Sequence, residues 1–203
     1  MIYRDPELEP EDHVVLEMIQ SQRQRLRTST QNTPRKWTGT LRKITFARAI
    51  QGSNSIEGYH SSMDEAVAAV NNEMPPDEPT EAWFAVRGYQ QALTCILQTA
   101  QDTSFEHSKQ FIKALQFMMA SHDMAKANPG QFRPGTIFVV DSATGETVYE
   151  APDRDAVDGL VNELVEYLRQ GQKLSALVTG AMAHLNLTMI HPFSDGNGRM
   201  ARA

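Results

Sequence analysis

Apolar residues recur at helical spacing along most of the chain, with polar residues between them. The first two such stretches predict helices over residues 11–27 and 36–57. Their expected inward positions are Val14, Val15, Met18, Ile19 and Leu26 in the first helix, and Leu41, Ile44, Phe46 and Ile50 in the second. Further helices are predicted over residues 62–73, 80–101 and 104–121, from Asp153 or Asp155 to Gly171, and from Leu174 to Ile190. The last of these is apolar over much of its surface, so we expect it to be central in a mainly α-helical fold.

Several predicted helices begin at side chains that can cap a first turn. Ser61 or Ser62 would cap the third helix, Thr80 the fourth and Ser104 the fifth. The second helix ends at Gly58, a residue suited to a left-handed C-terminal cap.

Residues 127–153 follow a different pattern. The run Thr136-Ile137-Phe138-Val139-Val140 is β-branched and aromatic, and Thr147-Val148-Tyr149 follows it after a short polar turn. This pattern predicts one β-hairpin in an otherwise helical chain. Because two strands alone are only marginally stable, the hairpin should rest on the helices or pair with another strand.

Composition narrows the function classes. The chain has 203 residues and a formal net charge of -6. That charge argues against a nucleic-acid-binding surface, which would need clustered lysine and arginine. No signal peptide and no apolar run of about 18 residues is present, so we expect a cytoplasmic protein without a membrane segment. Cys95 is the only cysteine, which excludes an intrachain disulfide, and its apolar neighbours indicate a buried small side chain.

The stretch with the most chemistry lies near the C-terminal end. It reads His191-Pro192-Phe193-Ser194-Asp195-Gly196-Asn197-Gly198-Arg199-Met200-Ala201-Arg202. A loop leads from His191 to a helix that can start near Gly198. The first amides of a helix lack partners within it and attract anions, and flanking glycines let the backbone approach a phosphate.

The side chains of this stretch suit phosphate chemistry. Asn197 offers donors, and Arg199 and Arg202 can bracket further phosphate charge. Asp195 is negatively charged and would repel a phosphate, but it suits the site if Mg²⁺ lies between the carboxylate and the phosphate. His191 can act as a general base near neutral pH. Phe193 is interpreted as an apolar plug that pins the loop to the core. Taken singly, a histidine before proline and a Gly-Asn-Gly turn are usually structural; only their combination points to a site.

This stretch resembles the signature of the Fic family, His-Pro-Phe-x-(Asp/Glu)-Gly-Asn-(Gly/Lys)-Arg-x-x-Arg, at every specified position. The hairpin at 136–150 resembles the Fic flap, and Gly130-Gln131-Phe132-Arg133 resembles the segment that leads into it. In that segment Arg133 is expected to be structural. The resemblance implies a mainly α-helical Fic-type bundle with one β-hairpin flap.

The resemblance also implies an activity, the transfer of AMP from ATP to a Ser, Thr or Tyr hydroxyl of a target protein, which the chain itself could be. His191 would deprotonate that hydroxyl and Asp195 would hold Mg²⁺ as cofactor. Arg202 would take the γ-phosphate. The ATP- and phosphate-binding set implied is Asp195, Gly196, Asn197, Gly198, Arg199, Met200, Ala201 and Arg202. The flap residues Ile137, Phe138, Val139 and Val140 would align the target segment by strand addition.

A second motif lies upstream. Ser53-Asn54-Ser55-Ile56-Glu57-Gly58 resembles the Fic inhibitory motif, (Ser/Thr)-x-x-x-Glu-(Gly/Asn). Glu57 would pair with Arg202 and so occupy the arginine that the γ-phosphate needs. ATP could then bind only with its α-phosphate in a poor position for attack. Ser53 would anchor the helix end. The alternative to an inhibitory role is a purely structural one, in which Glu57 is a solvated glutamate before a glycine cap.

The chain is expected to divide into an N-terminal helical region, residues 1–103, with the inhibitory helix at 36–58, and a Fic core at residues 104–203. Fic cores continue past the second arginine of the signature, so we expect a piece of a longer protein. The alternatives to AMP transfer are AMP removal, another phosphate transfer such as that of Doc-type kinases, which carry Lys at the position of Gly198, and an ATP-binding module without catalysis. A homo-oligomer is compatible with the sequence, which does not set the oligomeric state.

Overall fold

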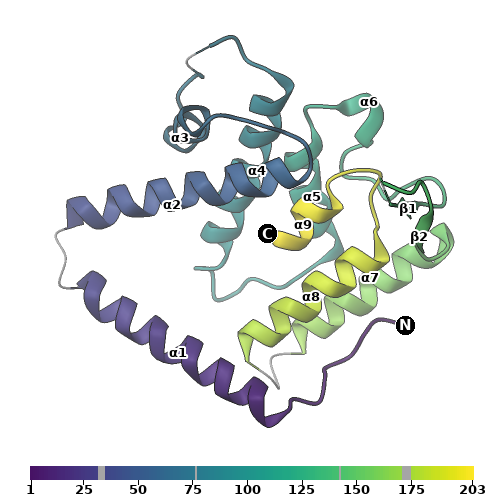
Figure 1. Ribbon diagram of the computed structural model, residues 1–203. Helices are drawn as coiled ribbons and strands as arrows, with labels where there is room; N and C mark the ends of the chain where they lie inside the picture. The colour runs from purple at the N-terminus through teal and green to yellow at the C-terminus, as the bar shows by residue number, and fades with distance from the viewer. Residues whose placement is uncertain (32–34, 76, 142, 171–174) are drawn as a thin grey trace.

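The computed structural model describes residues 1–31, 35–75, 77–141, 143–170 and 175–203 (Figure 1). Over these ranges the fold is mainly α-helical with one two-stranded antiparallel sheet, as the hydrophobic pattern predicted. The helices are α1 (Pro10–Gln31), α2 (Arg35–Ile56), α3 (Met63–Asn71), α4 (Glu81–Thr99), α5 (Lys109–Ala120), α6 (Met124–Ala127), α7 (Arg154–Arg169), α8 (Ala176–Ile190) and α9 (Asn197–Arg202). The strands are β1 (Phe138–Val140) and β2 (Thr147–Glu150). Nowhere in these ranges does a helix combine the length and apolarity needed to cross a membrane.

Side-chain caps set several helix starts. Ser62 caps α3 in a reciprocal capping box with Glu65, and Thr80 caps α4. The prediction that Ser104 starts the fifth helix was wrong. Its backbone and hydroxyl both donate to Asp102 at 2.9 and 2.7 Å, a local turn that competes with helix formation. Ser108 caps α5 instead, so the helix begins four residues later than expected.

The inward face predicted for α1 is exposed. None of its residues is buried, and Val14, Val15, Met18, Ile19 and Leu26 all face solvent in the described structure. Figure 1 shows α1 along one edge of the molecule. On α2, Leu41 and Ile44 are also exposed, whereas Phe46 packs against the core and Ile50 is fully buried. Periodicity identified an apolar stripe correctly, but it cannot show whether another element covers that stripe.

The core lies between α4, α5, α7 and α8, with α2, α3 and α9 packed around it. Gly88 of α4 makes the crossing with α5 possible, because a methyl group there would overlap the backbone carbonyl of Met118. Cys95 is partly buried against this core. The expectation that α8 is central holds for one face only, since Leu177 and Leu185 are exposed. The predicted boundary between α7 and α8, Gly171 and Leu174, lies outside the described residues.

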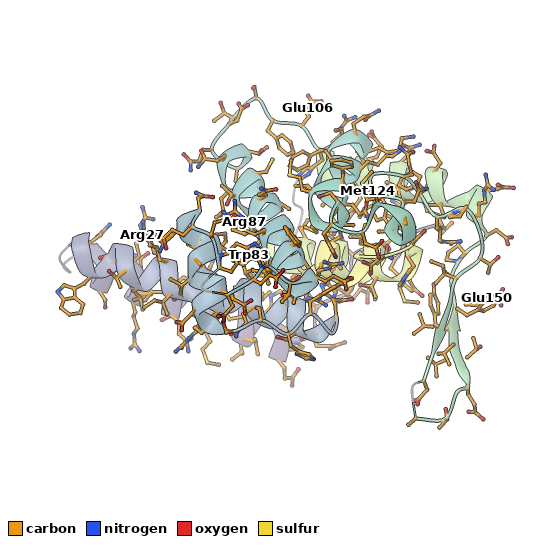
Figure 2. All side chains as sticks on the ribbon, turned by 90° about the horizontal axis from the view of Figure 1, so that it is seen from above. Arg27, Trp83, Arg87, Glu106, Met124 and Glu150 are labelled. Atoms are coloured by element: carbon orange, nitrogen blue, oxygen red, sulfur yellow. The ribbon has the colours of Figure 1, made fainter. Side chains whose placement is uncertain are left out.

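The hairpin projects from the helical body as an arm, with Glu150 near its base (Figure 2). Phe138 pairs with Glu150 and Val139 with Tyr149, and the register shifts between Val139 and Val140. The Tyr149 hydroxyl fastens its base to α8, because it donates to the Met189 carbonyl at 2.7 Å. The two arms of the hairpin are joined to each other at the base, where Ala151 donates to Ile137 O at 3.0 Å. Support from the helices is expected, because two strands alone are only marginally stable.

Candidate functional site

The signature stretch forms the connection between α8 and α9. His191 ends α8 in a left-handed conformation with φ of 49°, and its amide donates to Leu187 O at 3.0 Å. Gly196, with φ of 81°, precedes α9, which begins at Asn197. Met200 donates to Gly196 O, so the amides of residues 197–199 have no acceptor within the helix. The loop thus brings a histidine close in sequence and space to a helix start with free donors.

His191 is held by a buried arginine from the segment before the hairpin. Arg133 donates from Nε to His191 O at 2.9 Å, from one terminal nitrogen to Gly135 O at 2.5 Å and from the other to Pro152 O. Its backbone also donates to Pro192 O at 2.9 Å. Burial lowers the pKa of Arg133, and these charge-assisted bonds satisfy its guanidinium. One side chain therefore fixes the signature loop to both ends of the hairpin.

The His191 ring is half-buried and its pKa is lowered. Burial is the main cause, and a hydrogen bond to the backbone of Thr188 opposes it. The ring is therefore neutral at pH 7, which is the form that can accept a proton.

The loop between His191 and α9 is closed from within. Phe193 is fully buried against Phe132, with ring centroids 5.6 Å apart. Asn197 accepts from the Phe193 amide at 2.9 Å and donates to the Phe193 carbonyl at 2.7 Å. Both polar atoms of the buried Asn197 side chain thus hold the loop closed, and the expectation that this side chain donates to a phosphate stays a prediction.

Arg199, which was expected to bracket phosphate charge, is engaged with groups of the protein itself. Its side chain is 0% exposed and donates to Asp195 Oδ2 at 2.8 Å and to the Met119 carbonyl at 3.3 Å. It thereby ties α9 to α5 and orients Asp195. The backbone amide of Arg199 remains for an anion at the helix start, and the buried side-chain Nε has no hydrogen-bond partner among the described residues.

Arg202, unlike Arg199, contacts the C-terminal end of α2. It donates to Ser53 Oγ at 2.9 Å, to Ser53 O at 3.0 Å and to Glu57 Oε1 at 2.6 Å. The Arg202 and Glu57 side chains are 25% and 24% exposed. Gly58 follows with φ of 85° and turns the chain away after Glu57. The ion pair expected from the sequence is thus formed across 145 residues of chain.

Gly198 lies directly beneath this ion pair. A methyl group at Gly198 would overlap Glu57 Oε1 and would lie 3.0 Å from an Arg202 nitrogen. The Glu57 carboxylate therefore occupies space that exists only because residue 198 has no side chain.

Residues 102–203 match the family model described as Fic/DOC family. The chain belongs to the Fic/DOC family. It is 26% identical over 166 residues to a protein from Nematostella vectensis named protein adenylyltransferase Fic, a match that covers 79% of this chain and 36% of that protein.

Solved Fic structures share the fold. A Fic family protein from Desulfovibrio desulfuricans superposes with a TM-score of 0.75 at 24% identity, over 98% of this chain and 57% of that one. A Fic domain containing signaling protein from Bacteroides thetaiotaomicron gives a TM-score of 0.65 at 23% identity, over 82% and 61%. Fic-1 (residues 134–508) from C. elegans gives 0.61 at 21% identity, over 77% and 45%. The chain thus spans between about a third and two thirds of the length of these Fic relatives.

The strand that would correspond to the Fic flap is open to solvent. Phe138, Val139 and Val140 of β1 are all exposed, and Ile137 just before the strand accepts the hydrogen bond from Ala151. Pairing between β1 and β2 uses one edge of each strand, so the outer edge of β1 is available to a further strand within the described part of the molecule.

Gln116 was missed by the sequence reasoning on this Fic site. It is fully buried on α5, donates to Asp195 O at 3.0 Å and accepts from the Gly130 amide at 2.5 Å. It therefore joins the loop of Asp195 to the loop that leads into the hairpin. The available signal was a glutamine on the apolar stripe of α5, beside Leu115 and Met119, where a polar residue needs buried partners.

Proposed function

We propose that this chain carries a protein adenylyltransferase site, which moves AMP from ATP to a Ser, Thr or Tyr hydroxyl of a protein and is inhibited by its own Glu57. The observation that carries the proposal is the order of three groups along the signature segment. His191 begins the loop, the amides without acceptors follow at the start of α9, and the guanidinium of Arg202 at the end of α9 is paired with Glu57. The name of the relative from Nematostella vectensis supports the choice of AMP as the transferred group.

In the proposed reaction His191 takes the proton from the target hydroxyl. The hydroxyl oxygen forms a bond to the α-phosphorus of ATP, and the bond from that phosphorus to the bridging oxygen of the β-phosphate breaks. Pyrophosphate leaves and AMP stays on the protein. The amides of Asn197, Gly198 and Arg199 would receive phosphate oxygens, because they are donors at the positive end of a helix. Gly196, Met200 and Ala201 would shape this segment through their backbone.

Asp195 is the residue that would hold Mg²⁺. Arg199 binds its Oδ2, and the side chain is 38% exposed, so the carboxylate is oriented and still open to solvent. In the described residues no group of three or more His, Cys, Asp or Glu side chains could hold a metal alone. A single carboxylate fits Mg²⁺, which completes its shell with phosphate oxygens and water and supplies charge neutralisation to the phosphates when bound.

Inhibition is proposed to follow from the contact between Glu57 and Arg202. The carboxylate already takes the guanidinium that a γ-phosphate would use, and it adds negative charge where phosphate charge must come. ATP bound beside it would lose this anchor, so its α-phosphate would be held out of line for attack. Ser53 reinforces the closed state, because its hydroxyl and carbonyl both accept from Arg202.

The outer edge of β1 is proposed to dock the target. A peptide added as a strand would gain backbone hydrogen bonds from Val139 and Val140, while the exposed apolar side chains contact its residues. Because the partner strand β2 is fastened to the end of α8 through Tyr149 and Met189, a hydroxyl docked on β1 would be presented near His191.

The test is a transfer assay with ATP labelled on the α- or the γ-phosphate, with cell lysate as a source of targets. Glu57→Gly should raise incorporation of the α-label into protein by at least tenfold, and Glu57→Gln should give an intermediate gain because it keeps a hydrogen-bonding group without the charge. Adding His191→Ala to Glu57→Gly should abolish the gain while ATP binding persists.

Three outcomes would contradict the proposal. Label from the γ-phosphate alone would indicate a kinase. ATP binding without transfer by any variant would indicate a binding module. Equal incorporation by Glu57→Gly and wild type at saturating Mg-ATP would refute the inhibitory role.

A further inference from the structure

The segment that carries Glu57 touches a second arginine of α9. The Tyr59 ring lies over the Arg199 guanidinium, with 4.8 Å between the guanidinium carbon and the ring centroid. Glu57 meets Arg202 at the same time. The left-handed turn at Gly58 lets neighbouring side chains reach two arginines three residues apart on one helix.

The turn itself is closed by backbone hydrogen bonds. Asn54 O accepts from the amides of Glu57 at 3.0 Å and of Tyr59 at 3.1 Å, and Ser55 O accepts from Gly58 at 3.1 Å. These hydrogen bonds join Glu57 and Tyr59 to the same acceptor, Asn54 O, so the position of the Tyr59 ring affects the position of Glu57.

Arg199 offers Tyr59 a fixed platform. Its side chain is fully buried and is held on other sides by Asp195 and Met119, so the guanidinium stays in place when the Tyr59 ring contacts it. The Tyr59 ring also contacts His122 edge-on, with centroids 5.3 Å apart and an interplanar angle of 87°. A cation attracts the face of an aromatic ring most strongly where water is excluded, as it is around this guanidinium.

We infer that Tyr59 is a positioning residue, which holds the Glu57 carboxylate on Arg202 by docking its ring on Arg199. The inhibitory segment is then a two-point clamp on α9, with an ionic contact at Arg202 and an aromatic contact at Arg199. The ionic contact is the one that ATP challenges, whereas the aromatic contact lies on a buried group that phosphate does not reach. This inference rests on the proposed function for its activity readout only.

The size of the effect of losing the aromatic contact can be stated. A buried cation–π contact of about 1–2 kcal/mol corresponds to a change of about 5- to 30-fold in the equilibrium between the clamped and released segment. Tyr59→Leu keeps an apolar side chain but removes the ring, so basal transfer should rise by about that factor. Tyr59→Phe is the matched control, because it keeps the ring and should stay as inhibited as wild type.

The experiment measures two quantities on the same proteins. Transfer of the α-label is compared for wild type, Tyr59→Leu and Tyr59→Phe, each with and without Glu57→Gly. Hydrogen exchange of the backbone amides of residues 57–59, whose hydrogen bonds close the turn, is measured without nucleotide, and it reports loosening of the segment whether or not the protein is catalytic. Tyr59→Leu should exchange faster by about 5- to 30-fold, and it should add no activity to Glu57→Gly, since the carboxylate that it positions is already gone.

The outcomes separate the inference from the proposed function. If Glu57→Gly shows no transfer, the proposed function fails and hydrogen exchange alone decides on Tyr59. Unchanged exchange in Tyr59→Leu would overturn the inference. So would lower transfer by Tyr59→Leu in both backgrounds, because a purely structural lesion reduces activity and cannot raise it.

Discussion

Gly198 offers a sharp test of the proposed inhibitory contact between Glu57 and Arg202. The substitution Gly198→Ala adds one methyl group, and that group would overlap Glu57 Oε1. Because the carboxylate is the far end of a flexible side chain, it should swing away from Arg202 while the backbone of α9 stays in place. The variant thus removes the contact without removing any charge or deleting any contacting atom.

The size of the effect follows from the contact that is lost. Arg202 donates to Glu57 Oε1 at 2.6 Å in a site where both side chains are about three-quarters buried. A hydrogen bond between charged groups contributes about 1.5–3 kcal/mol. Its loss should raise apparent affinity for ATP and basal transfer by about 10- to 150-fold. Alanine also has a better helix propensity than glycine by about 1 kcal/mol, so α9 itself should not weaken.

The assay compares ATP binding by calorimetry and α-label transfer for wild type, Gly198→Ala, Glu57→Gly and the double variant. The double variant controls for damage, because a methyl group that harms the phosphate site would lower its activity below that of Glu57→Gly. The reasoning would be refuted if Gly198→Ala bound ATP as weakly as wild type while the double variant matched Glu57→Gly. The carboxylate would then tolerate the methyl group and keep its partner.

Two further predictions concern stability. Arg133→Met should lower the free energy of unfolding in urea by about 3–5 kcal/mol, because the carbonyls of His191, Gly135 and Pro152 lose a buried donor. The control is Arg154→Met, at an exposed arginine that donates to one carbonyl, which should cost under about 0.5 kcal/mol. Equal losses in the two variants would contradict the structural role of Arg133. Burial also lowers the pKa of the half-buried histidines, so the unfolded chain binds protons near pH 6.5 while the folded chain binds them only at lower pH. Stability should therefore fall as pH drops from 7.5 to 5.5, and a urea midpoint that stays constant over this range would contradict the prediction. These histidines are His107, His122 and His191.

Local signals in the sequence were sufficient for most elements. Helical periodicity and the caps at Ser62 and Thr80 predicted α3 and α4, and the left-handed turn at Gly58 was expected from residue type. The β-branched run before Val140 predicted the hairpin. Each of these features is decided by neighbours within a few residues along the chain, which is the range over which a single sequence is informative.

Features that depend on distant partners were not predictable in the same way. The stripe on α1 is amphipathic, but no pattern in the sequence could show that the described chain leaves it exposed. Arg133 was expected to be structural, yet its carbonyl partners lie up to 58 residues away and can be named only from the fold. Gln116 carried a signal, a polar residue on an apolar face, but the Asp195 carbonyl that satisfies it is contributed by another element.

The two arginines of α9 show why residue type alone does not assign a role in such a site. Arg199 and Arg202 are the same residue on the same short helix, and both are suited to phosphate by their chemistry. Arg199 is fully buried with carbonyl, carboxylate and aromatic partners, so its guanidinium would have to leave a closed site before it could meet ATP. Arg202 is partly exposed and is held by a glutamate that can rotate away. Of these two arginines, Arg202 is therefore the one that can exchange its partner, which supports the proposal that Glu57 and a phosphate compete for it.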